Sequence, residues 1–155
     1  MDHYPEWLGH DLVAGSLPWE QALSSSLAGF LGRFTLRDSH WIGLYHQPVH
    51  GATLLLRWDP REAEIEQRFS DSPPVEWLLL AVRFDGLERM DLKLRERRIA
   101  TAVSGATSRA ADVHRTHLED RRGGVATMLH APNVRLLCLT PDRAPLTLAV
   151  PAETL

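Results

Sequence analysis

The sequence predicts an α+β fold, in which a single antiparallel sheet of about six to eight strands, twisted or partly closed, carries one long amphipathic helix. Two observations predict this fold. Apolar residues recur at helical spacing near the N-terminus, whereas the later chain consists of short alternating or apolar runs separated by turn residues. The length of 155 residues suits one domain spanning residues 1–155.

The predicted helix begins near residue 17 and runs through Phe34 toward Asp38. Ser16 can cap its free N–H groups, and Pro18 fits the first turn, where a missing N–H costs nothing. Its apolar stripe has spacings of three and four and consists of Trp19, Leu23, Leu27, Phe30 and Phe34. Because each large side chain contributes roughly 1.5–3 kcal/mol on burial, we expect this stripe to anchor the fold.

A β-hairpin is expected after the helix. Side chains alternate from Trp41 to Tyr45, a mostly apolar run covers residues 52–58, and the connection between them contains Pro and Gly. Residues 1–15 predict an ordered lead-in or one short helical turn. For residues 59–69 a capping-box pattern favours a short helix over a strand.

Further strands follow from apolar runs bounded by turn residues. Residues 77–82 predict a central strand, and Asp85-Gly86 predicts a hairpin that returns through residues 87–94. The remaining expected strands cover residues 99–103, 125–130, 134–140 and 146–150. The segment 106–120 has no clear pattern.

Composition narrows the class of protein. The chain has no run of roughly 20 apolar residues and no basic, apolar leader at its start, so we expect a cytoplasmic protein without membrane contact. The single Cys138 lies in an apolar run and predicts a buried thiol. Residues 1–76 hold 11 acidic and 5 basic side chains, whereas residues 83–122 hold 7 acidic and 10 basic ones. This asymmetry, without a coherent basic surface, argues against nucleic-acid binding.

The candidate chemistry of the chain is centred on histidines. On a helix, His114 and His117 would share a face and could hold a metal, although the bland alternative is two exposed residues in a polar loop. His46 and His50 flank a hairpin tip and could form a metal pair or a pH-sensitive patch. Asp38-Ser39-His40 contains the residue types of a hydrolase triad, but such close neighbours rarely take its separate roles. We therefore expect no cofactor and favour a protein that is not an enzyme.

An acidic run after the hairpin predicts a docking surface for a basic protein partner. Its members, with the neighbouring tryptophan, are Asp59, Glu62, Glu64, Glu66, Asp71 and Trp58. A solvated face without a partner is the simpler interpretation of such a run. Aromatic side chains beside it favour binding, because they dominate interface hot spots.

The chain resembles the small immunity proteins of bacterial toxin systems in size and layout. The residues behind this resemblance are the helix leading into Asp38-Ser39-His40-Trp41-Ile42-Gly43, the strand end Arg57-Trp58-Asp59 and the closing hairpin 134–150. The resemblance implies a cytoplasmic bacterial protein that binds one toxin and blocks it, with acidic residues meeting a basic toxin domain. The alternative is a small metal-dependent enzyme that uses His114, His117 and neighbouring carboxylates. The pattern leaves the oligomeric state open.

Overall fold

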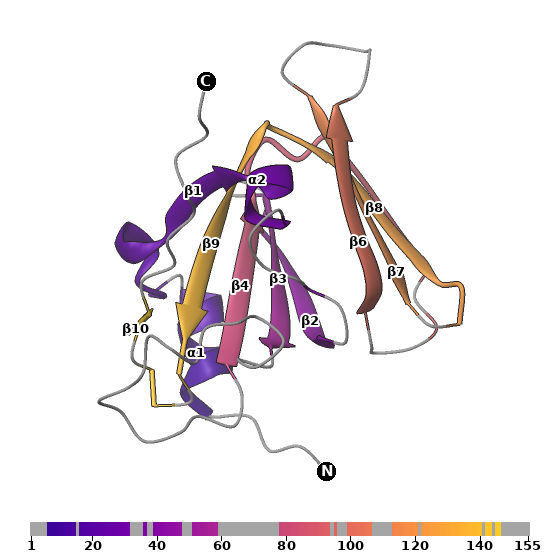
Figure 1. The fold of residues 1–155 in the computed structure, drawn as a ribbon. Coiled ribbons are helices and arrows are strands. Elements are labelled where there is room, and N and C mark those ends of the chain that lie inside the picture. The colour runs from indigo at the N-terminus through magenta and orange to yellow at the C-terminus, as the bar shows by residue number, and fades with distance from the viewer. Residues whose placement is uncertain are drawn as a thin grey trace.

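Two antiparallel sheets and two short α-helices make up the described part of the chain, so the predicted single sheet beneath a long helix is wrong (Figure 1). The computed structural model describes residues 6–14, 16–31, 36, 39–47, 51–58, 78–93, 95, 99–106, 113–120, 122–140, 142–143 and 145–146. Among these residues, no helix is long and apolar enough to cross a membrane.

Sheet A has the strand order β1-β9-β4-β3-β2, with β10 also beside β9. Its strands are β1 (Leu23–Ser26), β2 (His40–Gln47), β3 (Gly51–Trp58), β4 (Leu78–Phe84), β9 (Asn133–Leu139) and β10 (Pro145–Leu146). Sheet B has the order β5-β8-β7-β6. Its strands are β5 (Arg89–Lys93), β6 (Ile99–Ala106), β7 (His114–Asp120) and β8 (Val125–His130).

Sheet A is packed on both faces, which explains why its central strands are almost continuously apolar. On β4, Leu78 and Leu80 point into the main core, which also contains Leu118 and Met128 of sheet B. Leu79, on the opposite face of β4, lies in a second core that includes residues near the N-terminus. Helix α1 (Glu6–Ala14) covers this second core, so the molecule has the layer order helix, sheet A, sheet B.

The segment predicted as a long helix forms three short elements instead. They are a 3₁₀ turn η1 (Trp19–Gln21), strand β1 and helix α2 (Leu27–Leu31). Leu23 pairs with Leu136, because the outer edge of β9 needs a hydrogen-bonding partner. The real N-cap is Ser26, whose Oγ accepts the N–H of Gly29 at 3.1 Å. The apolar spacing still buries Leu27 and Phe30, both of which lie on α2.

The two sheets are joined at a corner where a two-stranded ribbon bends. Strands β4 and β5 form one arm of the ribbon and strands β8 and β9 the other, so β4 pairs with β9 and β5 pairs with β8. Asp85-Gly86 lies in this bend and is not the expected hairpin turn, because β4 and β5 do not pair with each other. The Ala131 N–H bonds to the Asp85 carbonyl at 2.9 Å, which continues the pairing across the corner.

Several strand predictions are confirmed. The hairpin appears as β2 and β3, residues 77–82 give the central strand β4, and residues 99–103, 125–130 and 134–140 correspond to β6, β8 and β9. The N-terminal turn is the nine-residue helix α1, and the unassigned segment 106–120 contains β7. The helix expected over 59–69 lies outside the described residues, as does most of the strand expected over 146–150.

Candidate functional site

Alternation of burial divides the side chains of sheet B between two faces. On β8 the side chains of Ala126 and Met128 are fully buried in the main core, whereas Thr127 between them is only partly covered. The same alternation on β7 buries Leu118 and turns His117 outward. The register then sets nine side chains on one outward surface, which we call the outer face: Arg89, Asp91, Lys93, Arg115, His117, Glu119, Val125, Thr127 and Leu129.

The outer face is an ordered array of three rows. Leu129 lies between Arg89 and Arg115, Thr127 lies between Asp91 and His117, and Val125 lies between Lys93 and Glu119. Six charged or titratable side chains thus surround a central column from β8. Each row therefore alternates a small or apolar residue with two polar ones, a pattern typical of the solvated face of an antiparallel sheet.

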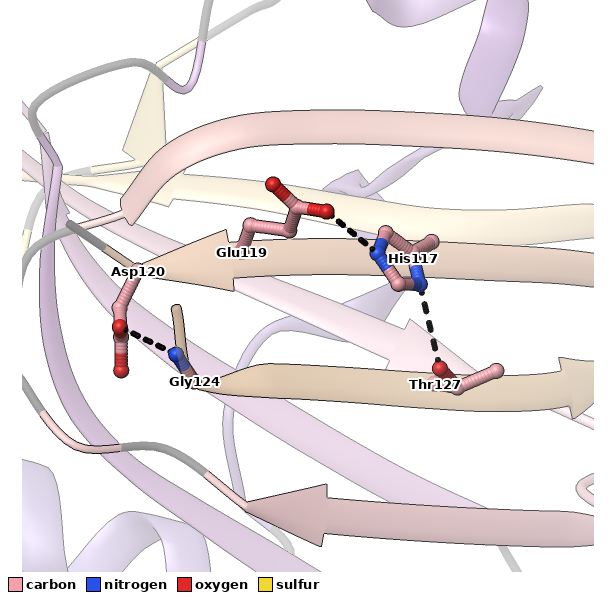
Figure 2. A network of polar contacts seen from close by, with 5 residues as sticks. All are labelled: His117, Glu119, Asp120, Gly124 and Thr127. Atoms are coloured by element: carbon pink, nitrogen blue, oxygen red, sulfur yellow. Dashed lines mark hydrogen bonds and ion pairs between the residues drawn. The ribbon is translucent and has the colours of Figure 1, made fainter. Parts of the chain in front are cut away.

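His117 holds the polar network at the centre of the outer face (Figure 2). Its Nε2 lies 3.0 Å from Oε1 of Glu119, and its Nδ1 lies 3.2 Å from Oγ1 of Thr127. A neutral imidazole with its proton on Nε2 satisfies both contacts, because it donates to the carboxylate and accepts the hydroxyl proton. The side chain of His117 is 27% exposed and that of Glu119 is 49% exposed, so both remain open to a partner.

Asp120 fixes the end of this face. It is buried, and its Oδ1 accepts the N–H groups of Gly124 at 2.7 Å and Arg122 at 2.9 Å. Its Oδ2 accepts the N–H of Arg95 at 2.5 Å. A Cβ at Gly124 would overlap with this carboxylate and with backbone atoms of Lys93 and Arg95. One carboxylate thus ties the β7–β8 turn, shown in Figure 2, to the end of β5.

A second histidine with defined partners lies on the inner side of sheet B. His130 is buried, with Nε2 at 2.6 Å from the Thr116 hydroxyl and Nδ1 at 2.6 Å from the Ala131 carbonyl. Its ring meets Phe84 edge-on, at a centroid distance of 4.9 Å. Burial lowers the pKa of His130, the hydrogen bond to Ala131 opposes this shift, and the nearby His114 lowers the pKa further. This imidazole is therefore a neutral core group at pH 7.

The residues predicted as a metal pair are separated by the strand. His114 and His117 are three positions apart on β7, and odd spacing on a strand sends side chains to opposite faces. His114 lies opposite His130 in the register, whereas His117 belongs to the outer face. Among the described residues, no three His, Cys, Asp or Glu side chains cluster at metal-binding distance. The alternative metal site on this pair is thus not assembled.

The predicted docking residues divide into two groups. Trp58 is 0% exposed and packs against Phe30 at a centroid distance of 5.7 Å, so its ring belongs to the main core and is closed to a partner. The five acidic residues of that surface, Asp59, Glu62, Glu64, Glu66 and Asp71, lie outside the described residues. His46 is exposed on β2, whereas His50 is outside the described part.

Two smaller predictions concern single residues. Ser39 of the Asp38-Ser39-His40 sequence is buried, and its hydroxyl donates to the Leu36 carbonyl at 2.5 Å, which is a local turn contact. Cys138 is a buried free thiol, as predicted, and burial raises its pKa to about 12. Neither side chain offers a nucleophile to solvent.

The network around His117 joins a hydroxyl, an imidazole and a carboxylate. Its order of hydroxyl, imidazole and carboxylate matches that of a hydrolase triad. Strands β7 and β8 each pair on both sides, however, so the ladder takes up their backbone N–H groups and leaves no oxyanion hole between them. What the network does provide is a set of polar groups held in fixed positions. Comparisons with protein families, with curated proteins and with solved structures each found no match.

Proposed function

We propose that the protein is a non-enzymatic binding module that recognises a protein partner with the outer face of sheet B. The observation that carries this proposal is the contrast between the sheet faces in the described part of the chain. Both faces of sheet A and the inner face of sheet B pack in apolar cores, whereas the described side chains of the outer face are exposed or half-buried and mostly polar.

The charge pattern of the outer face supports recognition of one specific partner. Arg89 and Asp91 are paired along β5 at 2.9 Å, and His117 and Glu119 are paired along β7 at 3.0 Å. Arg115 is exposed and makes no ion pair within the described residues, so it can meet an acid of a partner. Such a mixed array selects partners by complementary placement of charge more than by net charge.

The resemblance to bacterial immunity proteins suggests the partner's class, a basic toxin domain that the protein would neutralise in the cytoplasm. The acidic side chains of residues 59–71 remain part of this proposal as a source of electrostatic steering, which raises association rates at low salt. Trp58 is no longer part of the surface. In this arrangement the acidic segment attracts the partner and the outer face fixes its position.

The test begins with native mass spectrometry of the tagged protein isolated from its own cells, washed at low and then high salt. A stoichiometric protein partner would then be measured against Arg115→Glu and Glu119→Lys, with Glu20→Lys as the matched control. Glu20 is exposed in η1 and lies away from sheet B. We expect the outer-face variants to weaken affinity at least tenfold and the control to leave it unchanged.

Equal affinity of all three variants would overturn the assignment of the outer face. A protein that comes out alone with a mass increment matching a metal would instead favour the enzyme alternative. Alanine at Glu62, Glu64 and Glu66 should slow association at low salt, and an unchanged rate would remove the electrostatic steering from the proposal.

A further inference from the structure

Strand β5 forms one edge of sheet B and keeps a regular register along its length. Each residue from Arg89 to Lys93 has one partner on β8. By contrast, β2 and β6, the edge strands at the far ends of the two sheets, each contain a register shift. Such shifts bend an edge and discourage further pairing, whereas a regular edge is a template for another strand.

Among the residues that the structure describes, the backbone groups of Met90 and Leu92 have no partner strand. Asp120 N–H bonds to Gly124 carbonyl at 2.9 Å, which makes this a hydrogen-bonded pair of the β7–β8 ladder. Counting along the register from that pair, every second residue of β8, including Ala126 and Met128, directs its backbone N–H and C=O groups to β7. The alternate residues of β8 direct theirs to β5. In β5, Arg89, Asp91 and Lys93 therefore use their N–H and C=O groups toward β8, and the residues between them direct theirs outward.

The side chains of β5 suit a partner strand of particular chemistry. Leu92 is 43% exposed and is the one exposed large hydrophobic residue in the described part of the chain. On the other side of the strand, Asp91 and Lys93 are exposed with opposite charges two positions apart. Lysine on an edge strand usually guards against pairing, but here an acid lies beside it on the same face.

We propose that β5 pairs with β5 of a second copy of this chain, antiparallel and with the two-fold axis at Leu92. This register sets Asp91 opposite Lys93 of the second copy, and it does so twice because of the symmetry. It also sets the two Leu92 side chains opposite each other, with their own backbone groups forming the central hydrogen-bonded pair. Opposite charges and apolar pairs are the cross-strand combinations that stabilise a sheet.

The neighbouring registers are less favourable. An axis at Asp91 would set the two Asp91 carboxylates against each other and Arg89 against Lys93. An axis at Met90 would leave Leu92 opposite Glu88. In the register centred on Leu92 the pairs within β5 are Leu92 with Leu92 and Asp91 with Lys93, and the charge of Arg89 is compensated by Asp91 at 2.9 Å.

Dimerisation would join the two sheets B into one continuous antiparallel sheet and set both outer faces on the same broad surface. Asp91 and Lys93 also belong to the outer face, but this inference does not depend on the proposed partner binding, because self-association is measured on the chain without a partner. A five-residue strand is a small interface, so we expect the dimer to dissociate on dilution.

The experiment measures mass by sedimentation equilibrium over a concentration series of the full chain. Asp91→Lys and Lys93→Asp each introduce like charges at both cross-strand positions, so each single variant should be monomeric where the unaltered chain is dimeric. The double variant Asp91→Lys/Lys93→Asp restores opposite charges and should dimerise. An equimolar mixture of the two single variants should also form a dimer. Asp142→Lys, an exposed charge change in the turn before β10, serves as the control.

A cross-link locates the axis independently of charge. Paired residues in a hydrogen-bonded antiparallel pair lie roughly 5.5 Å apart between Cα atoms, within disulfide range. Leu92→Cys should therefore cross-link two chains under mild oxidation, whereas Lys93→Cys, equally accessible, should not. A monomer at every concentration would overturn the proposal. So would a dimer that the single charge variants leave intact, or equal cross-linking of the two cysteine variants.

Discussion

The carboxylate of Asp120 gives the sharpest test of how the β7–β8 turn is held. We expect Asp120→Ala to be among the most destabilising single substitutions in sheet B. The side chain accepts the N–H groups of Arg95, Arg122 and Gly124, and the residue is only 4% exposed. All three hydrogen bonds are charge-assisted, which makes them stronger than bonds between neutral groups.

The magnitude depends on where the three donors lie. Gly124 is buried, so its N–H would lose its acceptor without gaining water, at about 1–3 kcal/mol. Arg95 and Arg122 are exposed and water can replace the acceptor there, so each loss costs roughly 1 kcal/mol. Asp120→Ala should therefore lower the free energy of unfolding by about 3–5 kcal/mol. Asp120→Asn keeps one acceptor oxygen but turns an amide N–H₂ toward the N–H of Arg95. We therefore expect this variant to lower the free energy of unfolding by about 1–3 kcal/mol.

Urea unfolding followed by tryptophan fluorescence measures this difference, provided that the slope of free energy against urea is unchanged. Asp142→Ala, which removes an exposed carboxylate, should change stability by less than about 0.5 kcal/mol. Gly124→Ala should destabilise strongly, because its Cβ would overlap with Asp120. Combining it with Asp120→Ala should then cost less than the sum of the two, since removing the carboxylate relieves part of the overlap. A loss below about 1 kcal/mol for Asp120→Ala would refute the reasoning.

Three further outcomes concern a buried histidine, a buried cysteine and a glycine with positive φ. Because the folded protein keeps His130 neutral, it binds fewer protons than the unfolded chain below pH 6.5, and its stability should fall as the pH drops from this value toward the lowered pKa of His130. His130→Gln should flatten this dependence of stability on pH, measured by thermal unfolding at a series of acidic pH values. An unchanged slope would contradict the assignment. Cys138, with its pKa raised to about 12, should react with a thiol reagent only at the rate of unfolding, and rapid labelling of the native protein would count against its burial. Gly51 and Gly123 have similar positive φ values, +82° and +80°, but only at Gly51 would an added Cβ overlap with a carbonyl, that of Phe84. Gly51→Ala should therefore lower the stability more than Gly123→Ala. Equal losses in urea unfolding would show that this overlap is relieved.

The sequence alone determined the elements whose signals are local. The hairpin of β2 and β3 follows from alternation and from its Pro-Gly connection, and β4 follows from a continuous apolar run. These patterns depend on the pleat of a strand, which needs no knowledge of its partner. The buried state of Cys138 follows in the same way from its neighbours in β9.

For the candidate site, the sequence indicated His117 but left its element unassigned, and the metal pair that it offered with His114 depended on a helix. A helix would set His114 and His117 together, whereas strand β7 sets them on opposite faces and gives His117 to Glu119 and Thr127. The available signal was weak, because Leu118 is the only apolar residue between His114 and Asp120. Thr127 is ten positions away, and only the register of β7 with β8 brings it to His117.

Tertiary structure decided which strands pair, and with that the whole architecture. Leu23 and Phe30 fit a helical stripe, yet β1 breaks that helix because the open edge of β9, more than a hundred residues later, takes up its backbone groups. Likewise Asp85-Gly86 has the composition of a hairpin turn but lies in a corner, because β5 pairs with β8. The hydrophobic periodicity of a segment carries no information about a hydrogen-bonding partner that is distant in sequence. The chain's pattern therefore defines which faces are apolar, and the competition among strand edges determines where each face is buried.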